Sequence, residues 1–143
     1  MPVFPVGVPE DVLSRTMLVI RGRYDFAVDG GLVGTIAITS GTPIPPGSTI
    51  IGGYVDVLTQ LISGGAATIA CQVEGAADIL SAIAVASWTA GRKNVLPAPS
   101  SGDLTAATVV RTTAARDISI VIGAAALTAG KFDVVLFVLP AVS

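Results

Sequence analysis

The sequence of 143 residues contains no histidine, one cysteine and charged residues at only 13% of its positions. Histidine is the commonest general base and the commonest metal ligand, so its absence removes the simplest routes to acid–base catalysis and metal binding. A single cysteine cannot form an internal disulfide. Charge is well below the roughly 25% usual for soluble domains. Contacts between subunits would cover part of so apolar a surface.

Catalytic motifs are also missing. A serine nucleophile has neither a GxSxG elbow nor a histidine base. No Asp-x-Asp-x-Asp-Gly pattern marks a calcium loop, and no glycine-rich loop ends in a lysine to hold phosphate. A glycosidase needs two facing carboxylates, but candidates such as Asp25 and Asp56 fall at outward positions of expected strands. We therefore predict no enzyme, no cofactor and no metal site.

Charge and hydropathy also bear on partners. The net charge is −2 and the basic residues are scattered, which does not resemble a nucleic-acid footprint. Asp117, Lys131 and Asp133 interrupt the strongest apolar runs, so no clean span of about 20 apolar residues exists. The N-terminus lacks a secretory signal pattern. We expect a soluble chain that binds neither nucleic acid nor membrane.

Apolar residues alternate in two runs of the C-terminal third, Ile118–Ile122 and Phe132–Leu139. Because side chains of a strand point to alternate faces, each run supplies one row to a core. We predict two strands that pair antiparallel at the centre of a β-sandwich.

Similar alternation predicts a long strand over 17–28, with Arg21, Arg23 and Asp25 on its wet face, and another over 48–61. Gly52-Gly53 within the latter predicts a bulge or a close backbone approach. A hairpin is expected to join it to a strand over 67–73, where Cys71 reads as a small buried apolar residue rather than a reactive thiol. Residues 78–83 favour a short helix, with a strand as the rival interpretation.

These patterns together predict an all-β fold, an antiparallel β-sandwich of jelly-roll-like type with seven to nine strands and at most one short helix. We divide the chain into an extended Pro-rich N-terminal arm, residues 1–16, and a β-sandwich domain, residues 17–143. Within the arm, residues 9–13 could form one helical turn.

The arm combines prolines with apolar side chains that would be unfavourable in water: Val3, Phe4, Val6 and Val8. It either lies along its own domain or reaches a neighbouring subunit, and we predict contact with a partner. Trp88, beside Arg92 and Lys93, is predicted as a second interface anchor. The alternative for Trp88 is a semi-buried position at the rim of the sandwich.

Three stretches of strands and turns follow one another along the chain: RGRYDFAVDGGLVGTIAI, IIGGYVDVLTQLISGGAATIACQVEGAADIL and RTTAARDISIVIGAAALTAGKFDVVLFV. In them the chain resembles a family of small, head-associated virion proteins of tailed bacteriophages. The resemblance covers Arg21 to Val138 and includes no catalytic signature. It implies a capsid decoration (cement) protein, made in the host cytoplasm and placed on the capsid surface. Such a protein forms homo-oligomers, with a trimer favoured, and bridges subunits of the major capsid protein.

Two other functions stay open on the sequence alone. One is a carbohydrate- or receptor-binding β-sandwich module of a phage fibre or surface protein, with Trp88 and Tyr54 as the free aromatic candidates. The other, an enzyme, would need carboxylates that converge in a cleft. The structural virion protein is our leading hypothesis.

Overall fold

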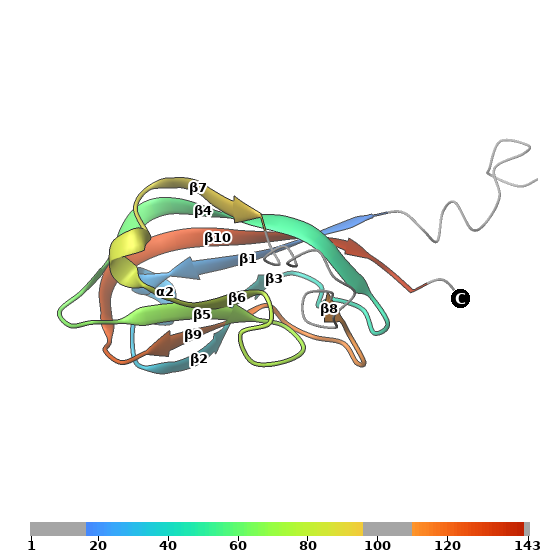
Figure 1. Ribbon diagram of the computed structural model, residues 1–143, viewed down its shortest axis with the longest axis horizontal. Helices are drawn as coiled ribbons and strands as arrows, with labels where there is room; N and C mark the ends of the chain where they lie inside the picture. Colours follow the sequence, from blue (N-terminus) through green and yellow to red (C-terminus); the bar gives the residue numbers. More distant parts are fainter. Residues whose placement is uncertain (1–16, 96–109, 142–143) are drawn as a thin grey trace, which may run out of the picture.

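The computed structural model describes residues 17–95 and 110–141, which form two antiparallel sheets (Figure 1). Sheet A contains β1 (Leu18–Asp25), β3 (Thr39–Ser40), β4 (Thr49–Ser63), β7 (Gly91–Val95), β8 (Val110–Arg111) and β10 (Leu127–Leu139). Sheet B contains β2 (Gly34–Ala37), β5 (Thr68–Gln72), β6 (Leu80–Ala84) and β9 (Ser119–Gly123). The predicted all-β sandwich is confirmed. Ten strands are described, two of them only two residues long, against the seven to nine expected.

Pairing of the eight longer strands is nested along the chain. β1 pairs with β10, β2 with β9, β4 with β7 and β5 with β6. The chain therefore resembles one long hairpin that is rolled up into two sheets, in the order β1-β10-β4-β7 and β2-β9-β5-β6. This is the jelly-roll arrangement that the sequence predicted.

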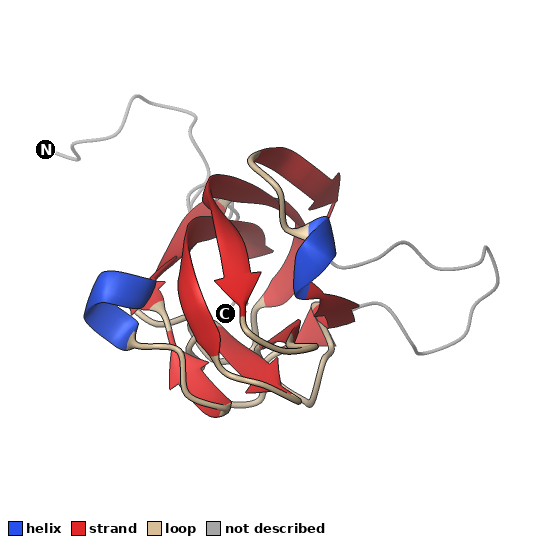
Figure 2. Cartoon of the chain, turned by 90° about the vertical axis from the view of Figure 1, so that its left-hand side faces the viewer, coloured by secondary structure: helices blue, strands red, loops and turns tan. Residues whose placement is uncertain are grey.

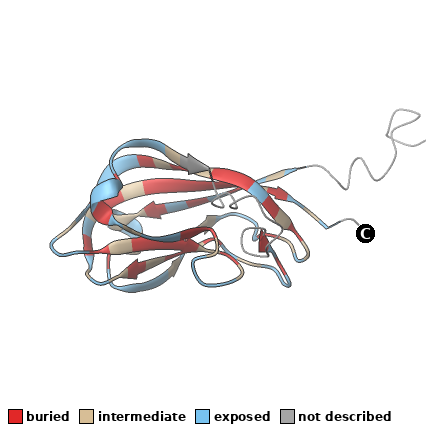
Figure 3. Ribbon diagram, viewed as in Figure 1, coloured by how far each residue is buried: buried red, intermediate tan, exposed pale blue. Residues whose placement is uncertain are grey.

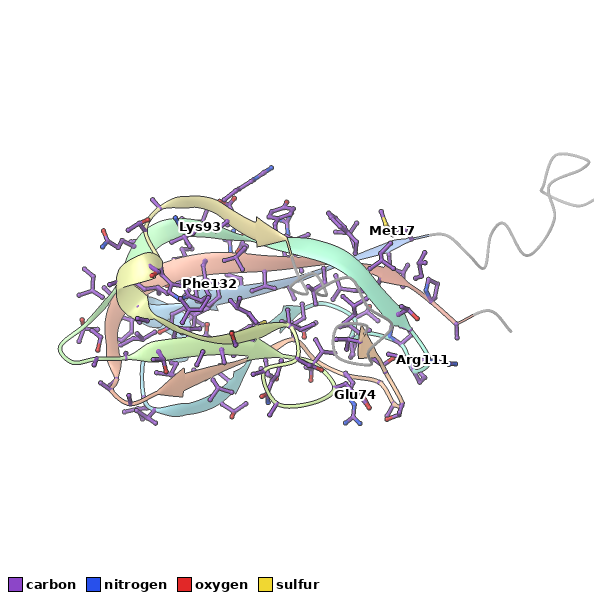
Figure 4. All side chains as sticks on the ribbon, viewed as in Figure 1. Met17, Glu74, Lys93, Arg111 and Phe132 are labelled. Carbon is purple, nitrogen blue, oxygen red and sulfur yellow. The ribbon has the colours of Figure 1, made fainter. Side chains whose placement is uncertain are left out.

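The core lies between the sheets and follows the predicted alternation (Figure 3). In β1 the core-facing residues are buried and their neighbours are exposed: Ile20, Gly22 and Tyr24 against Val19, Arg21 and Arg23. Phe132, labelled in Figure 4, is fully buried. The rings of Tyr24 and Trp88 lie beside it, at centroid distances of 5.3 and 4.8 Å. Cys71 is fully buried, as predicted.

Two predicted pairings are wrong. β9 and β10 do not pair, because β9 lies in sheet B between β2 and β5, whereas β10 lies in sheet A between β1 and β4. Likewise β4 and β5 do not form a hairpin, since they belong to opposite sheets. In both cases the glycine-containing turn carries the chain from one sheet to the other. Local alternation fixes which side chains are buried, but it does not distinguish a hairpin from such a crossing.

Two local predictions also differ from the structure. The strand over 17–28 ends at Asp25, and Phe26–Asp29 forms a short helix, α2. The Asp25 side chain accepts a hydrogen bond from the Ala27 backbone N–H, and Asp29 accepts one from the Asp25 N–H. These caps stabilise the helical turn against the alternating pattern. Residues 80–84 form β6, the rival interpretation, and a 3₁₀ turn, η1 (Val85–Ser87), follows.

Gly53 shows the predicted close approach. A Cβ atom there would lie 2.3 Å from the backbone oxygen of Val135 on β10. Beside it, Phe137 pairs with Gly52 while Val138 pairs with Ile50, so Ile51 is the extra residue of a β-bulge.

The two chain ends that the structure describes leave the sandwich at the same end, opposite α2 (Figure 1). Figure 2 looks at the α2 end and shows α2 and η1 on opposite sides of the sheets. No helix in the described part of the chain is long and apolar enough to cross a membrane. The predicted arm, residues 1–16, lies outside the described residues.

Candidate interaction surface

The outer face of sheet A divides into two halves. Residues that lie side by side across β1, β10 and β4 share a face because the strands are in register. One row joins Arg23, Asp133 and Asp56, and another joins Val19, Phe137 and Gly52. Charged side chains therefore gather in the half towards α2, and apolar ones in the half where the chain enters β1.

In the half towards α2, which we call the ion-paired half, acidic and basic side chains pair with one another. Arg23 binds Asp133 through two hydrogen bonds, Nε to Oδ1 at 2.6 Å and Nη2 to Oδ2 at 2.9 Å. The hydrogen bond from Arg23 lowers the pKa of Asp133, whose residue is only 7% exposed. Lys131 lies 3.6 Å from Asp25, and Arg92 lies 3.7 Å from Asp56, between side-chain nitrogen and carboxylate oxygen. From the sequence, Asp133 stands out only as an interruption of an apolar run, and its ion pair with Arg23 was not predicted.

The apolar half presents an uncovered cluster, which we call the arm-root patch. Its members lie at the ends of β1 and β10 and at the β4 bulge, and most are 38–56% exposed: Met17, Val19, Ile51, Phe137 and Leu139. Phe137 is half-buried beside Tyr54, at a ring-centroid distance of 6.2 Å. Figure 4 shows Met17 on the outer side of sheet A, where the described chain begins. Contiguous exposed apolar groups of this kind mark contact surfaces.

A groove runs along the edge of sheet A next to this patch. It has a volume of about 340 Å³ and lies between the start of β1 and the segment after β3, and we call it the edge groove: Leu18, Val19, Ile20, Ser40, Thr42, Pro43 and Pro45. Among the described residues, β1 pairs with β3 only at Arg21 and Gly22. On the side away from β10, the first residues of β1 therefore face the groove and pair with no strand of the described residues.

The far wall of the edge groove is held firmly. The Pro45 carbonyl accepts hydrogen bonds from the hydroxyls of Ser48, at 2.6 Å, and Thr112, at 2.7 Å. Ile44 is fully buried and exchanges two backbone hydrogen bonds with Arg116, at 2.8 and 3.0 Å. The groove is thus a fixed feature of the fold.

Arg116 also ties this wall to the turn after β5. Its Nε lies 2.8 Å from Glu74 Oε2, and the Thr113 hydroxyl donates to the same carboxylate. Hydrogen bonds from Arg116 and then Thr113 lower the pKa of Glu74 to about 2. The contact therefore keeps its charge far into the acid range.

The other predicted site residues fall in different places. Trp88 is 4% exposed, packs on Phe132, and borders a hollow of about 240 Å³ between β4, β6 and β7. Its Nε1 has no hydrogen-bond partner among the described residues. The cation–π contact is made by Arg92 over the Tyr54 ring, at 4.9 Å, and not by Trp88. The interface role of Trp88 stays a prediction.

Val3, Phe4, Val6 and Val8 lie outside the described residues, so their predicted partner contact also stays a prediction. The structure places their point of attachment, Met17, within the arm-root patch. Asp25 and Asp56, the carboxylates considered for catalysis, each face a basic partner.

A second group of exposed apolar side chains lies at the opposite end of the sandwich. Val28 in α2 and Leu32 and Val33 after it are 80%, 81% and 57% exposed. The other exposed large apolar residues of the described chain, Leu58 and Ile62, lie on β4. The molecule therefore carries apolar groups at both of its ends.

The fold and these surfaces define a jelly-roll sandwich with two apolar ends. Neither a protein family nor a curated protein sequence matches the chain. Among solved structures, it is similar to a chain in the capsid asymmetric unit of cyanophage Pam1, with 17% identity and a TM-score of 0.61 over 99% of this chain and 100% of that chain. It is also similar to a chain in the acid-stable capsid of Helicobacter pylori bacteriophage KHP30, with 13% identity and a TM-score of 0.56 over 89% and 90% of the two chains. At these identities the similarity shows a shared fold.

Proposed function

We propose that this chain is a structural protein of a phage virion, a decoration (cement) protein that binds the outside of the capsid and bridges its subunits. The fold is shared with chains from two phage capsids. The match to the cyanophage Pam1 chain extends over nearly the whole of both chains, so the two chains are of similar length.

The observation that carries the proposal is the arm-root patch on a molecule of this fold. The apolar half of the outer face suits contact with a partner, and the half whose charges pair with one another suits contact with water. The exposed residues at the α2 end supply a second contact, which a bridging protein requires. We expect homo-oligomers, with a trimer favoured, and the major capsid protein as the partner.

The proposed function is tested by mass measurement and particle binding. The full chain is sedimented alone, and then with phage heads that were assembled without this protein. Assembly into a homo-oligomer and co-sedimentation with the heads are expected. A chain that stays monomeric and does not pellet with heads would refute the proposal.

The alternative of a sugar-binding module receives no support from the aromatic side chains of the described residues. Trp88 lies in the core, and Tyr54 is half-buried beside Phe137 and beneath Arg92. A glycan array checks this alternative, and we expect no specific binding.

A further inference from the structure

We propose that the N-terminal arm of one copy adds a strand to sheet A of a second copy, with Phe4–Val8 lying in the edge groove against the start of β1. The inference rests on the proposed function, which requires copies of the chain to associate, and it names the surface that receives the arm. The occupant is the arm of a second copy of this chain.

The receiving site has the features that strand addition needs. β1 pairs with β10 along its whole length, but on its other side the described residues pair with it only at Arg21 and Gly22. The Arg23 backbone N–H donates to Ile38 on that side, at 2.9 Å, so the backbone groups of Val19, four residues earlier, point the same way. Edge groups of this kind are templates for an added strand.

The opposite wall of the groove offers apolar contact in place of a second ladder. Pro43 and Pro45 line it, and proline has no backbone N–H to donate. A strand in the groove would therefore form its ladder with β1 alone and lay side chains against the prolines.

The arm sequence has the alternation of an edge strand. In an extended chain, successive residues direct their N–H and C=O groups to opposite sides. Phe4, Val6 and Val8 share one side and all keep their N–H, whereas Pro5, Gly7 and Pro9 share the other. Prolines are tolerated in an edge strand only on the side that faces away from the ladder. The arm can thus present three donors and three apolar side chains in one register.

Continuity with the arm-root patch favours a second copy over the chain's own arm. The arm joins the domain at Met17, which belongs to the patch, and Val19 belongs to both the patch and the groove. An arm folded back on its own domain would fill the groove but leave most of the patch in water. When a second copy places its arm in the groove, the patch around its own Met17 is brought towards the patch of the first copy. One contact between two copies then covers both the groove and the patch.

Cross-linking between two cysteine variants tests the proposal. Val6→Cys and Thr42→Cys proteins are mixed and treated with a short bismaleimide. Thr42 lines the groove, and its residue is exposed. The native Cys71 does not interfere, because it is fully buried and burial raises the pKa of its thiol to about 12. A covalent adduct that joins one chain of each variant is expected.

Two outcomes would overturn the inference. The Val6→Cys/Thr42→Cys double variant, diluted into excess wild-type protein, reports on the chain's own arm. An adduct formed within single chains there, with none between the mixed single variants, would mean that each copy fills its own groove. No adduct in either experiment would mean that the arm does not reach the groove. If the wild-type chain still oligomerises and pellets with heads in these cases, the proposed function stands while the arm contact fails.

A matched pair of proline variants tests the register. Val6→Pro removes a donor on the ladder side, and we expect about tenfold weaker self-association, the effect of one lost backbone contact. Gly7→Pro changes the outward side and should leave self-association unchanged, because proline also biases Val6 towards the extended conformation. Equal effects of both substitutions in sedimentation equilibrium, or no effect of either, would contradict the proposed register.

Discussion

The two halves of the outer face of sheet A are built from the same strands but meet solvent in opposite ways. Along β10 the outward residues run from Lys131 and Asp133, through Val135, to Phe137 and Leu139. At the charged end, two ion pairs join β10 to β1, and a third joins β7 to β4. Within the part of the chain that the structure describes, the apolar end has no such ion pairs, and most members of the arm-root patch are exposed.

This difference shows which half is complete. Charges that pair within one sheet remove the need for an external partner, whereas apolar area that remains in water is a source of binding free energy. We therefore propose partner contact for the apolar half and solvent contact for the ion-paired half. Substitutions in the two halves test this proposal, from the largest expected effect to the smallest.

A lysine placed in each half should have opposite consequences for assembly. Val19→Lys puts an unpaired charge into the arm-root patch, and we expect self-association and head binding to fall by about a hundredfold. Leu58→Lys is the control, since Leu58 is similarly exposed, 44% against 56%, but lies outside the patch. Analytical ultracentrifugation measures both variants. Equal losses would show that the two halves do not differ in function.

The close packing of β4 against β10, which carries both halves, can be broken at Gly53. Gly53→Ala places a Cβ atom 2.3 Å from the Val135 oxygen, so β4 and β10 must move apart. We expect a loss of about 2 to 3 kcal/mol in the free energy of unfolding. Gly64→Ala is the control, because nothing lies within 4 Å of its new Cβ atom. Urea denaturation measures both, and an unchanged midpoint for Gly53→Ala would contradict the packing described.

Removal of the buried charge of Asp133 tests the ion-paired half. Asp133→Asn keeps the shape but loses the charge-assisted pair with Arg23, and we expect about 1 to 2 kcal/mol of destabilisation. Asp56→Asn, whose partner is 3.7 Å away at the surface, should cost about 0.5 kcal/mol or less. Neither substitution should change self-association, since both lie in the ion-paired half.

The Asp133 effect should depend on pH with a defined sign. Because the pKa of Asp133 is lowered below its usual value of 3.8, its ionised form stabilises the folded state above that value. The contribution is lost as the pH falls through the lowered pKa. The difference in unfolding free energy between wild type and Asp133→Asn should therefore be constant above about pH 5 and shrink below it. A difference that grows on acidification would contradict the assignment.

Sequence reasoning predicted the features that depend on local alternation. The burial of Ile20 and Tyr24 in β1, and of the isoleucines of β9, follows from a period of two. The bulge beside Gly53 was signalled by paired glycines within an apolar run. The arm-root patch was not predicted, because Val19 and Phe137 join only when β1 and β10 pair across the whole chain.

The partner of an individual strand could not be predicted from the sequence. Whether the turn after Ser63 closes a hairpin or crosses between sheets depends on the partner of β4, which is β10. Asp25 and Asp29 are residues that can cap a short helix, but the apolar alternation through Val28 favours a strand over the same positions. The edge groove exists because β1 and the segment after β3 lie apart, and no pattern in the sequence indicates this separation.

The position of β10 has a consequence for folding during synthesis. Sheet A needs this strand between β1 and β4, and the Arg23–Asp133 pair spans 110 residues of chain. β1 must therefore wait for the synthesis of β10 before sheet A can close around it. A translation product that stops short of Leu127 would lack the middle of the sheet and two of the five members of the arm-root patch. Only chains that include β10 could then join a larger assembly.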